Sequence, residues 1–372
     1  MKICFWGNVA SAIAGNTPGG GELQIALLAK ALSLGGHDVC ILDYTIQDGF
    51  VTSEGVKVIP VQDWNKGIRI LRTLTHRLPG LYKSLVAQKA DIYYCRIREF
   101  RHIIAYWAAR KVRARFVLGL AHDLEVLSFF KRCKYDYFTN IGDFWWISNL
   151  LLSEITFPWL LQKSDHVFVQ HSGQEEILLK KGIKSLIFPN LIDLNEIPDD
   201  RPPAKEDFAF VGSLAKSKGI IELFQLISRT PEYTYKIIGQ PRDKTGRQYL
   251  DKLESLSNVK VMGRLNHSDT LMQIKKSEAL ISTSPFEGFP NIFIEAWACE
   301  TPVLSLYVNP GNVFKHKEMG FCSNGDIHNL INQMKQIKYC HKLASSARLY
   351  SELTFGLNGK RISEIDQIFR NL

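Results

Sequence analysis

Glu287 and Glu295 are the residues whose types and spacing most clearly suggest chemistry, and they lie eight positions apart. Leu280–Thr283 reads as a strand, so Glu287 falls in the loop beyond its carboxyl end. A helix is predicted to begin near Asn291, where free N–H groups and the positive dipole end suit a diphosphate. Glu295 could accept hydrogen bonds from ribose hydroxyls, and Glu287 from those of a sugar. The spacing alone fits a capped helix with an incidental pair of glutamates equally well.

Alternating strands and helices must position these residues. In the first half, the predicted strands are Lys2–Gly7, Asp38–Asp43, Val56–Pro60, Ile92–Cys95, Arg115–Leu120 and His166–Gln170. A glycine-rich loop ending at Gly19-Gly20-Gly21 precedes a predicted helix over Glu22–Leu34. Strands separated by helices indicate a parallel sheet with crossover connections.

The alternation stops at Ile192–Lys205, which contains Pro202-Pro203 and has the composition of a linker. It then restarts, with predicted strands at Phe208–Gly212, Tyr233–Gly239, Val259–Gly263, Ala279–Ser284 and Pro302–Leu306. We therefore predict an α/β protein with two Rossmann-like domains, 1–197 and 204–355. A C-terminal helix over 356–372 is expected to pack back toward the first domain. Such sheets bind ligands beyond the carboxyl ends of their strands, so the two domains should face each other across a deep cleft.

The segment Glu287–Leu306, EGFPNIFIEAWACETPVLSL, resembles the E-x7-E region of glycosyltransferase family 4. Two further elements of that family fall in the same order. One is the glycine-rich loop at Gly19–Glu22, and the other is Gly212-Ser213-Leu214 followed by Lys218-Gly219. The resemblance covers nearly the whole chain and implies the GT-B fold and retaining transfer from a nucleotide-diphosphate sugar. It also implies that domain 1–197 binds the acceptor and that domain 204–355 binds the nucleotide sugar.

The resemblance implies a role for each matching residue. Lys218 would place a positive charge on the donor diphosphate, Glu287 would face the transferred sugar and Glu295 would hold the ribose. Backbone groups near Gly239 and 263–265 would frame the base. Glycines of the first loop would approach the phosphates, because only a residue without a side chain allows that approach. The implied donor-binding residues are Gly20, Gly21, Gly212, Ser213, Lys218, Gly239, Arg264, Glu287, Gly288, Phe289, Asn291, Ile292 and Glu295.

Ser213 departs from the family pattern, which usually has a diphosphate-binding arginine there. Hydrogen-bond donors that face the negative charge developing on the leaving group usually make the largest single contribution to catalysis. Lys216 and Arg264 are candidates to replace that arginine; weaker donor binding or reduced activity are the alternatives.

His122 matches the histidine that the family places near the reacting sugar, so the implied catalytic residues are Glu287, Lys218 and His122. A single histidine at a strand end is otherwise usually structural. Asp123 is predicted to cap the next helix rather than to act as a base.

No D-x-D motif occurs in the chain. Metal-dependent transferases of the other major fold typically use that motif to hold a divalent cation on the diphosphate. We therefore predict neither metal nor other cofactor, only the nucleotide sugar as co-substrate. No nucleophile with an adjacent base is recognisable, which fits retaining chemistry in which the leaving diphosphate helps to deprotonate the acceptor.

The charge distribution bears on partners and location. The chain carries a net charge of +9, and residues 57–134 contain 17 Lys/Arg against 5 Asp/Glu. Such a surface attracts phospholipid, lipid diphosphate or nucleic acid, and nucleic acid is disfavoured because its recognition motifs are missing. The apolar runs are too short for a signal peptide or a spanning helix, and the seven scattered cysteines suggest reduced thiols. We expect a cytoplasmic protein, and the basic region favours a peripheral position on the cytoplasmic face of the membrane.

An apolar stripe between Trp64 and Leu81 recurs at helical spacing, beside several arginines. It fits a helix docked on its sheet or a helix lying on an anionic bilayer. Aromatic residues between Phe129 and Trp146 fit either a core or an acceptor channel.

Together these features predict transfer of a hexose or N-acetylhexosamine from a UDP- or GDP-sugar to a saccharide or lipid-linked saccharide, as in the biosynthesis of surface polysaccharides. The alternatives are a non-catalytic nucleotide-sugar-binding protein and another GT-B enzyme such as a sugar epimerase. A dehydrogenase is a further alternative, because Asp43 closes the strand after the glycines. Gln24 occupies the position of its third glycine, however.

Overall fold

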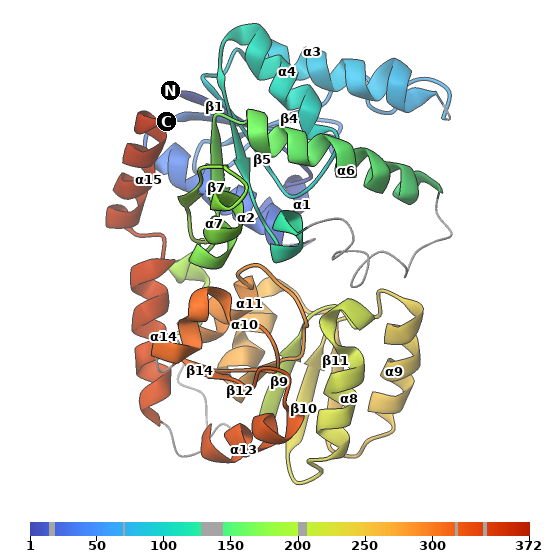
Figure 1. Ribbon diagram of the computed structural model, residues 1–372, viewed down its shortest axis with the longest axis vertical. Coiled ribbons are helices and arrows are strands. Elements are labelled where there is room, and N and C mark those ends of the chain that lie inside the picture. The colour runs from blue at the N-terminus through green and yellow to red at the C-terminus, as the bar shows by residue number, and fades with distance from the viewer. Residues whose placement is uncertain (15–18, 70, 128–143, 200–206, 317–318, 338–340) are drawn as a thin grey trace. The chain divides into compact units, whose positions relative to one another are not determined.

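The computed structural model describes all residues except 15–18, 70, 128–143, 200–206, 317–318 and 338–340, and it divides the chain into two compact units (Figure 1). The first unit holds the described residues up to Leu191 together with Leu357–Leu372, and the second holds Ile192–Gly356. The Pro202-Pro203 pair of the predicted linker lies outside the described residues. No helix in the described part of the chain is long and apolar enough to cross a membrane.

The first unit is built on a twisted sheet that is parallel except at one edge. Its strands are β1 (Lys2–Trp6), β2 (Asp38–Asp43), β3 (Phe50–Val51), β4 (Lys57–Pro60), β5 (Ile92–Arg96), β6 (Arg115–Gly119), β7 (His166–Val169) and β8 (Leu186–Ile187). They lie in the order β3-β4-β2-β1-β5-β6-β7-β8, and only β3 is antiparallel to its neighbour. The strands from β4 to β7 have the order of a Rossmann sheet. Successive strands are added on one side of β1 and then, from β5 onward, on its other side.

Helices cover both faces of this sheet. They are α1 (Ala10–Ile13), α2 (Gly20–Leu34), α3 (Leu78–Gln88), α4 (His102–Val112), α6 (Phe144–Lys163), α7 (Ser172–Leu179) and α15 (Gly359–Asn371), with short helical turns η1 (Thr73–Arg77) and η2 (Asp123–Val126). One apolar layer joins the sheet to α3, α4, α6 and α7, and the other joins it to α1, α2 and α15. Ile365 and Phe369 of α15 are fully buried in the second layer, so this helix belongs to the first unit.

The second unit repeats the arrangement with a fully parallel sheet. Its strands are β9 (Asp207–Val211), β10 (Thr234–Ile238), β11 (Val259–Gly263), β12 (Ser277–Ser282), β13 (Val303–Ser305) and β14 (Gly320–Cys322), in the order β11-β10-β9-β12-β13-β14. Its helices are α8 (Ile220–Ser228), α9 (Lys244–Glu254), α10 (His267–Lys275), α11 (Asn291–Ala298), α12 (Val313–His316), α13 (Ile327–Ile337) and α14 (His341–Thr354), with short turns η3 (Leu194–Glu196), η4 (Lys216–Lys218) and η5 (Pro310–Asn312). One face of the sheet packs on α10, α11, α12 and α14, and the other on α8, α9 and α13. The strand order reverses between β9 and β12.

The apolar stripe between Trp64 and Leu81 does not form one helix. A turn of π-helix, η1, precedes α3, and Pro79 lies in the first turn of α3, where the missing N–H costs no helical hydrogen bond. Trp64 and Leu81 are buried, whereas Ile68, Leu71 and Leu74 are 72%, 53% and 71% exposed. The prediction of a helix docked on the sheet therefore holds for α3 and is wrong for the segment before it.

Candidate functional site in the second unit

The loops that leave β9 and β12 meet where the strand order reverses, which is where open α/β sheets bind ligands. Gly219 allows them to approach closely. A Cβ atom at Gly219 would lie 2.0 Å from the carbonyl oxygen of Thr283, and its φ of +69° favours glycine. The Thr283 hydroxyl donates to the carbonyl oxygen of Lys218, over 3.0 Å. The backbone thus fixes the loop that carries Lys218 against the loop that carries Glu287.

Lys218 and Glu287 form an ion pair across these loops. Their side chains are 33% and 15% exposed, so both remain accessible to a ligand while partly withdrawn from water. Two opposite charges at a sheet switch point can bind the phosphate and hydroxyl ends of one ligand.

The amino end of α11 begins four residues after Glu287. Its N-cap residue is Pro290, which makes no side-chain capping hydrogen bond. The backbone N–H groups and the positive end of the helix dipole suit an anion at such a position. The ring of Phe289 packs against Trp297 and Phe355 in the core. Only its backbone could contact a ligand. Gly288 is buried beside it, and Asn291 and Ile292 are partly exposed in the first turn of α11.

Two predicted glycines bring the carboxyl ends of the neighbouring strands together. The Gly212 N–H donates to Ile238, and the Gly239 N–H donates to Gly263. A Cβ atom at Gly239 would lie 1.8 Å from the Gly212 carbonyl oxygen, and its φ is +149°. Ser213 follows at this edge and is partly exposed.

The two candidate replacements for the missing arginine are both exposed. Lys216 begins the short turn η4 that ends at Lys218, and its N–H donates to the Asp243 carboxylate. Arg264 follows β11 directly. Both belong to loops at the carboxyl edge of the sheet.

Glu295 is held by a histidine that the sequence analysis did not single out. The His267 Nε2 lies 3.3 Å from the Glu295 carboxylate, and its Nδ1 lies 2.8 Å from the Glu196 carboxylate. Hydrogen bonds to these two carboxylates raise the pKa of His267 to about 10. The His267 imidazolium, which contacts both carboxylates, therefore holds the Glu295 side chain in place. The three residues come from separate segments, so no local pattern could have revealed the contact.

The remaining predicted residues belong to the first unit. His122 accepts a hydrogen bond at Nδ1 from the Leu124 N–H and so caps η2 itself. The prediction that Asp123 provides this cap is wrong, because its carboxylate accepts hydrogen bonds from His171 and Gln174. Gly20 opens α2. A Cβ atom at Gly21 would lie 2.4 Å from the Ile97 side chain, so glycine allows close packing there.

Glu125 is a further residue that the sequence analysis missed. Its buried carboxylate accepts hydrogen bonds from the N–H groups of Arg98 and Ala121. Burial raises the pKa of this carboxyl group above its usual value. Glu125 thus ties the loop after β5 to the loop that carries His122.

Asp43 has a structural role. One carboxylate oxygen accepts from the N–H groups of Val9 and Ala10, and the other from the N–H and hydroxyl of Thr45. Asp43 is completely buried. Because both oxygens are already bonded, it is poorly suited to hold a ribose, which argues against the dehydrogenase alternative.

Comparisons with known proteins bear on this arrangement. The family described as "Glycosyl transferases group 1" matches residues 195–351. This segment is a group 1 glycosyltransferase domain. Lys218, Glu287, Glu295 and His267 all lie within that domain. An uncharacterized glycosyltransferase from Methanocaldococcus jannaschii is 26% identical over 99 residues, which span 27% of this chain and 28% of that protein.

Solved structures extend the likeness to the whole chain. Sucrose-phosphate synthase from Thermosynechococcus elongatus is 17% identical, with a TM-score of 0.77 over 100% of this chain and 98% of that one. HepE from Anabaena, solved with UDP-glucose, is 15% identical, with a TM-score of 0.68 over 100% and 98% of the two chains. A glycosyltransferase from Rickettsia africae is 15% identical, with a TM-score of 0.67 over 100% and 99%. The fold is therefore GT-B, with the group 1 glycosyltransferase domain as its second Rossmann-like unit.

Proposed function

We propose that the protein is a retaining, metal-independent glycosyltransferase of family 4 that uses a UDP- or GDP-sugar. The observation that carries this proposal is the Lys218–Glu287 pair at the β9/β12 switch point, inside the group 1 glycosyltransferase domain. The donor would be a hexose or N-acetylhexosamine derivative. UDP is favoured because the similar HepE structures contain UDP or UDP-glucose.

Neighbouring elements would each bind a different part of the nucleotide sugar. Lys218 and the amino end of α11 would bind the diphosphate, and their positive charge would stabilise the leaving group without a metal ion. Glu287 would bind hydroxyls of the transferred sugar, and Glu295, fixed by His267, would bind the ribose. Backbone groups near Gly239 and Arg264 would frame the base.

The acceptor would be a saccharide or lipid-linked saccharide bound by the first unit. His122 would shape the acceptor site or hold a donor hydroxyl through Nε2, because Nδ1 already accepts from Leu124. The acceptor hydroxyl would attack the sugar on the same face from which the diphosphate leaves. The leaving diphosphate would help to remove the proton of that hydroxyl. The aromatic residues 129–138 proposed for an acceptor channel lie outside the described residues.

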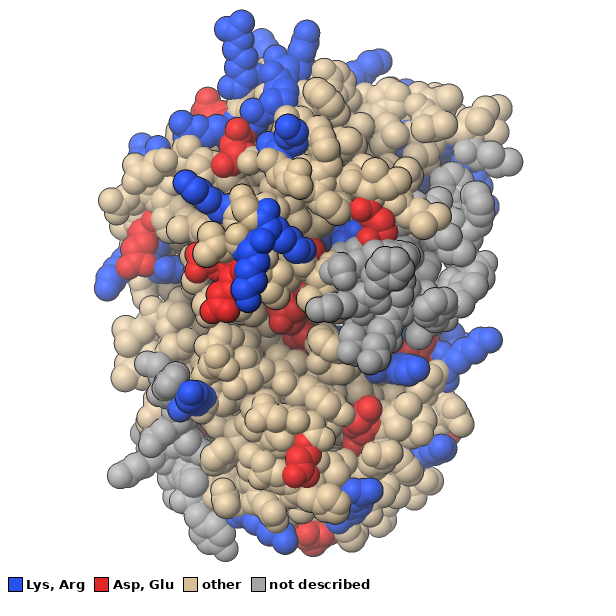
Figure 2. Space-filling view, in the orientation of Figure 1, with Lys and Arg blue, Asp and Glu red and all other residues tan. Residues whose placement is uncertain are grey.

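A peripheral position on the cytoplasmic face of the membrane is part of the proposal. The exposed side chains of Ile68, Leu71 and Leu74 lie in the segment before α3, beside the basic residues Lys66 and Arg69. Figure 2 shows further Lys and Arg side chains projecting from the end of the first unit that carries α3 and α4. Apolar side chains surrounded by cations suit the interface of an anionic bilayer.

Thermal unfolding in EDTA with UDP, GDP, ADP, CMP or NAD tests the donor site. A nucleotide at 100 times its Kd adds about 2.7 kcal/mol of stability, which is a shift of several degrees. We expect a shift with UDP or GDP that is lost in Lys218→Ala and kept in Lys244→Ala, which removes an exposed lysine of the same unit. If only NAD raises the unfolding temperature, or if none of the nucleotides does, the proposal is overturned.

Turnover separates the proposed transferase from its alternatives. A non-catalytic binding protein would show the UDP shift without releasing UDP when saccharide acceptors are supplied. An epimerase would convert the UDP-sugar without any acceptor. Acceptor-dependent release of UDP, with the anomeric configuration of the donor retained in the product, is the result that we expect.

A further inference from the structure

Arginines and aromatic rings form a cluster at the carboxyl edge of the first sheet. Trp6 ends β1, Tyr44 follows β2, Trp64 follows β4 and Arg101 follows β5. Because these strands are parallel, their carboxyl ends lie along one edge, where such sheets bind ligands. His122 follows β6 at this same edge.

The rings form a platform for two guanidinium groups. Tyr44 and Trp64 are stacked, with their centroids 4.7 Å apart. The Arg101 guanidinium lies 5.3 Å from both rings, and that of Arg77 lies 5.2 Å from Trp64. The Arg77 Nε–H also donates to the Trp64 carbonyl oxygen. Stacking on rings fixes both guanidinium groups in place, and both arginines remain partly exposed.

Positive charge is concentrated in this cluster. Burial and the nearby charges of Arg72 and Arg101 lower the pKa of Arg77. The carboxylates nearby are Glu99, which pairs with Arg101, and Asp43, whose oxygens accept hydrogen bonds from backbone N–H groups and Thr45. Like charges held together beside aromatic rings cost free energy, and an anionic ligand would offset that cost.

We propose that Arg77 and Arg101, on the Tyr44–Trp64 platform, bind a phosphate or diphosphate group of the acceptor. The planar fork of a guanidinium group matches phosphate oxygens in pairs, so two fixed arginines can hold one diphosphate. This inference rests on the proposed function, since it names the chemical class of the acceptor. It adds a binding site in the first unit that is separate from the donor residues of the second.

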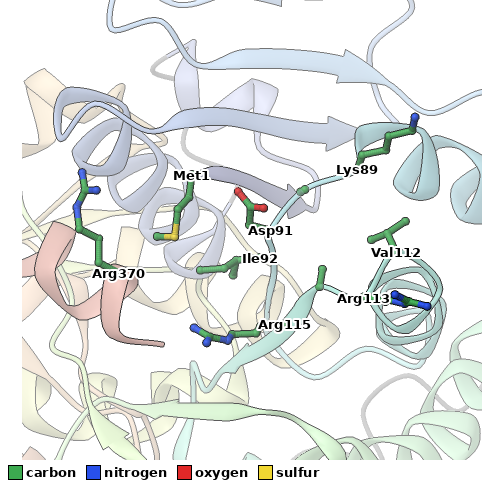
Figure 3. A pocket seen from close by; sticks show the side chains of 10 residues that line it. Met1, Lys89, Asp91, Ile92, Val112, Arg113, Arg115 and Arg370 are labelled. Carbon is green, nitrogen blue, oxygen red and sulfur yellow. The ribbon is translucent and has the colours of Figure 1, made fainter.

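The opposite edge of the same sheet provides a control. There a hollow of about 720 Å³ is lined by Lys89, Asp91, Arg113 and Arg115, among others (Figure 3). Figure 3 shows the Lys89, Arg113 and Arg115 side chains pointing away from one another. All three are exposed, so this edge has similar charge without a fixed platform.

Binding of inorganic diphosphate, measured by calorimetry, tests the site. All variants carry Lys218→Ala, which weakens the donor site. We compare that single variant with the addition of Arg77→Gln and Arg101→Gln, and with the control addition of Arg113→Gln and Arg115→Gln. Both additions remove two positive charges from the same unit.

The expected result is that removing both cluster arginines weakens diphosphate binding about a hundredfold, and that the control pair changes it less than about threefold. Equal losses in both pairs would mean attraction by net charge alone and would overturn the proposal. UDP binding to the protein with Lys218 unchanged is measured alongside. If UDP does not bind, the proposed donor site is wrong, whereas the diphosphate comparison still tests the proposed arginine site.

A measurement on the unsubstituted protein covers the case in which the double variant does not fold. The Nε–H signals of Arg77 and Arg101, assigned by single Arg→Lys changes, should shift in nitrogen-15 spectra as diphosphate is added with UDP saturating the donor site. Unmoved signals for both arginines would refute the site. The Arg113 signal should stay in place.

The source of the phosphate group is distinguished by a second ligand. Geranyl diphosphate carries the same group on a short lipid chain. Tighter binding than inorganic diphosphate, reduced by Leu71→Ser and Leu74→Ser, would identify a lipid-linked acceptor. Equal binding of both ligands would identify a soluble phosphorylated saccharide. If neither ligand depends on Arg77 and Arg101, the proposal is wrong.

Discussion

Glu287 combines a mostly buried carboxylate with a cation from a different loop. Its ion pair with Lys218 keeps a negative charge at a point where a neutral sugar would bind. Such a charge strengthens hydrogen bonds from sugar hydroxyls, and more so as the reacting sugar gains positive character. The pair therefore joins the phosphate and sugar halves of the proposed donor site.

We predict that Glu287→Gln lowers kcat/KM for transfer by about a hundredfold while UDP binds with nearly unchanged affinity. The amide keeps the shape of the side chain but removes the charge, and UDP lacks the sugar that Glu287 would contact. Kinetics and UDP calorimetry on the same samples measure the two effects. Glu254→Gln, which changes an exposed glutamate of the same unit, should leave both unchanged. A large loss of UDP affinity in Glu287→Gln would contradict the assigned role.

His267 adds a pH dependence to the second unit. Its pKa is raised to about 10, compared with about 6.5 for an unperturbed histidine. A raised pKa in the folded state means that the charged imidazolium contributes its full stability below pH 6.5. That contribution then falls between pH 6.5 and 10 and is lost above.

We predict that His267→Gln reduces the free energy of unfolding by about 1–3 kcal/mol near pH 6, with little effect near pH 10. Denaturant unfolding at a series of pH values measures the difference between the variant and the unsubstituted protein. His328→Gln, on an exposed turn of α13, should show no such trend. A difference independent of pH would mean that His267 is neutral in the folded protein.

At the scale of elements, the approach of the β9 and β12 loops depends on one backbone position. Gly219 and Gly263 have nearly equal φ values, +69° and +68°, but different surroundings. A Cβ atom at Gly219 would meet the Thr283 carbonyl at 2.0 Å, whereas one at Gly263 would meet nothing within 4 Å. Alanine is strained at both positions, but only Gly219 has a steric reason to be glycine.

We therefore predict that Gly263→Ala costs about 1 kcal/mol, the usual cost of the left-handed conformation, and that Gly219→Ala costs at least about 2 kcal/mol more. Because the clash forces apart the loops of Lys218 and Glu287, Gly219→Ala should also weaken UDP binding. Thermal unfolding with and without UDP measures both effects. Equal destabilisation by the two substitutions would show that the loops can separate without cost.

The long strands could be predicted from sequence because each is an apolar run bounded by glycine or polar residues. All eleven predicted strands are present to within two residues at either end. The strands that were missed, β3, β8 and β14, have only two or three residues, too few to show a periodic pattern. The contacts of Asp43, Glu125 and His267 were also unpredictable, because each joins segments that are distant in sequence.

At the scale of the whole molecule, the chain does not complete its units in sequence order. It forms most of the first unit, then the second, and returns with α15 to the first. His37 pairs with Asp366 of α15, and Phe369 stacks edge-on against Phe168 and Phe188. The net charge of +9 is likewise a property of the whole chain, but the positive charge is unevenly distributed and is concentrated in residues 57–134.

That concentration, together with the exposed side chains before α3, makes membrane binding testable. We predict that the protein sediments with vesicles containing anionic phospholipid at low salt, and that binding weakens as salt screens the charges. Ile68→Ser, Leu71→Ser and Leu74→Ser together should reduce binding at least about tenfold, because apolar surface no longer enters the interface. Replacing the exposed Ile155 and Leu349 by serine removes apolar surface elsewhere and should have little effect. If the protein stays in the supernatant at low salt, the proposal of membrane binding is wrong, and the proposed donor site is unaffected.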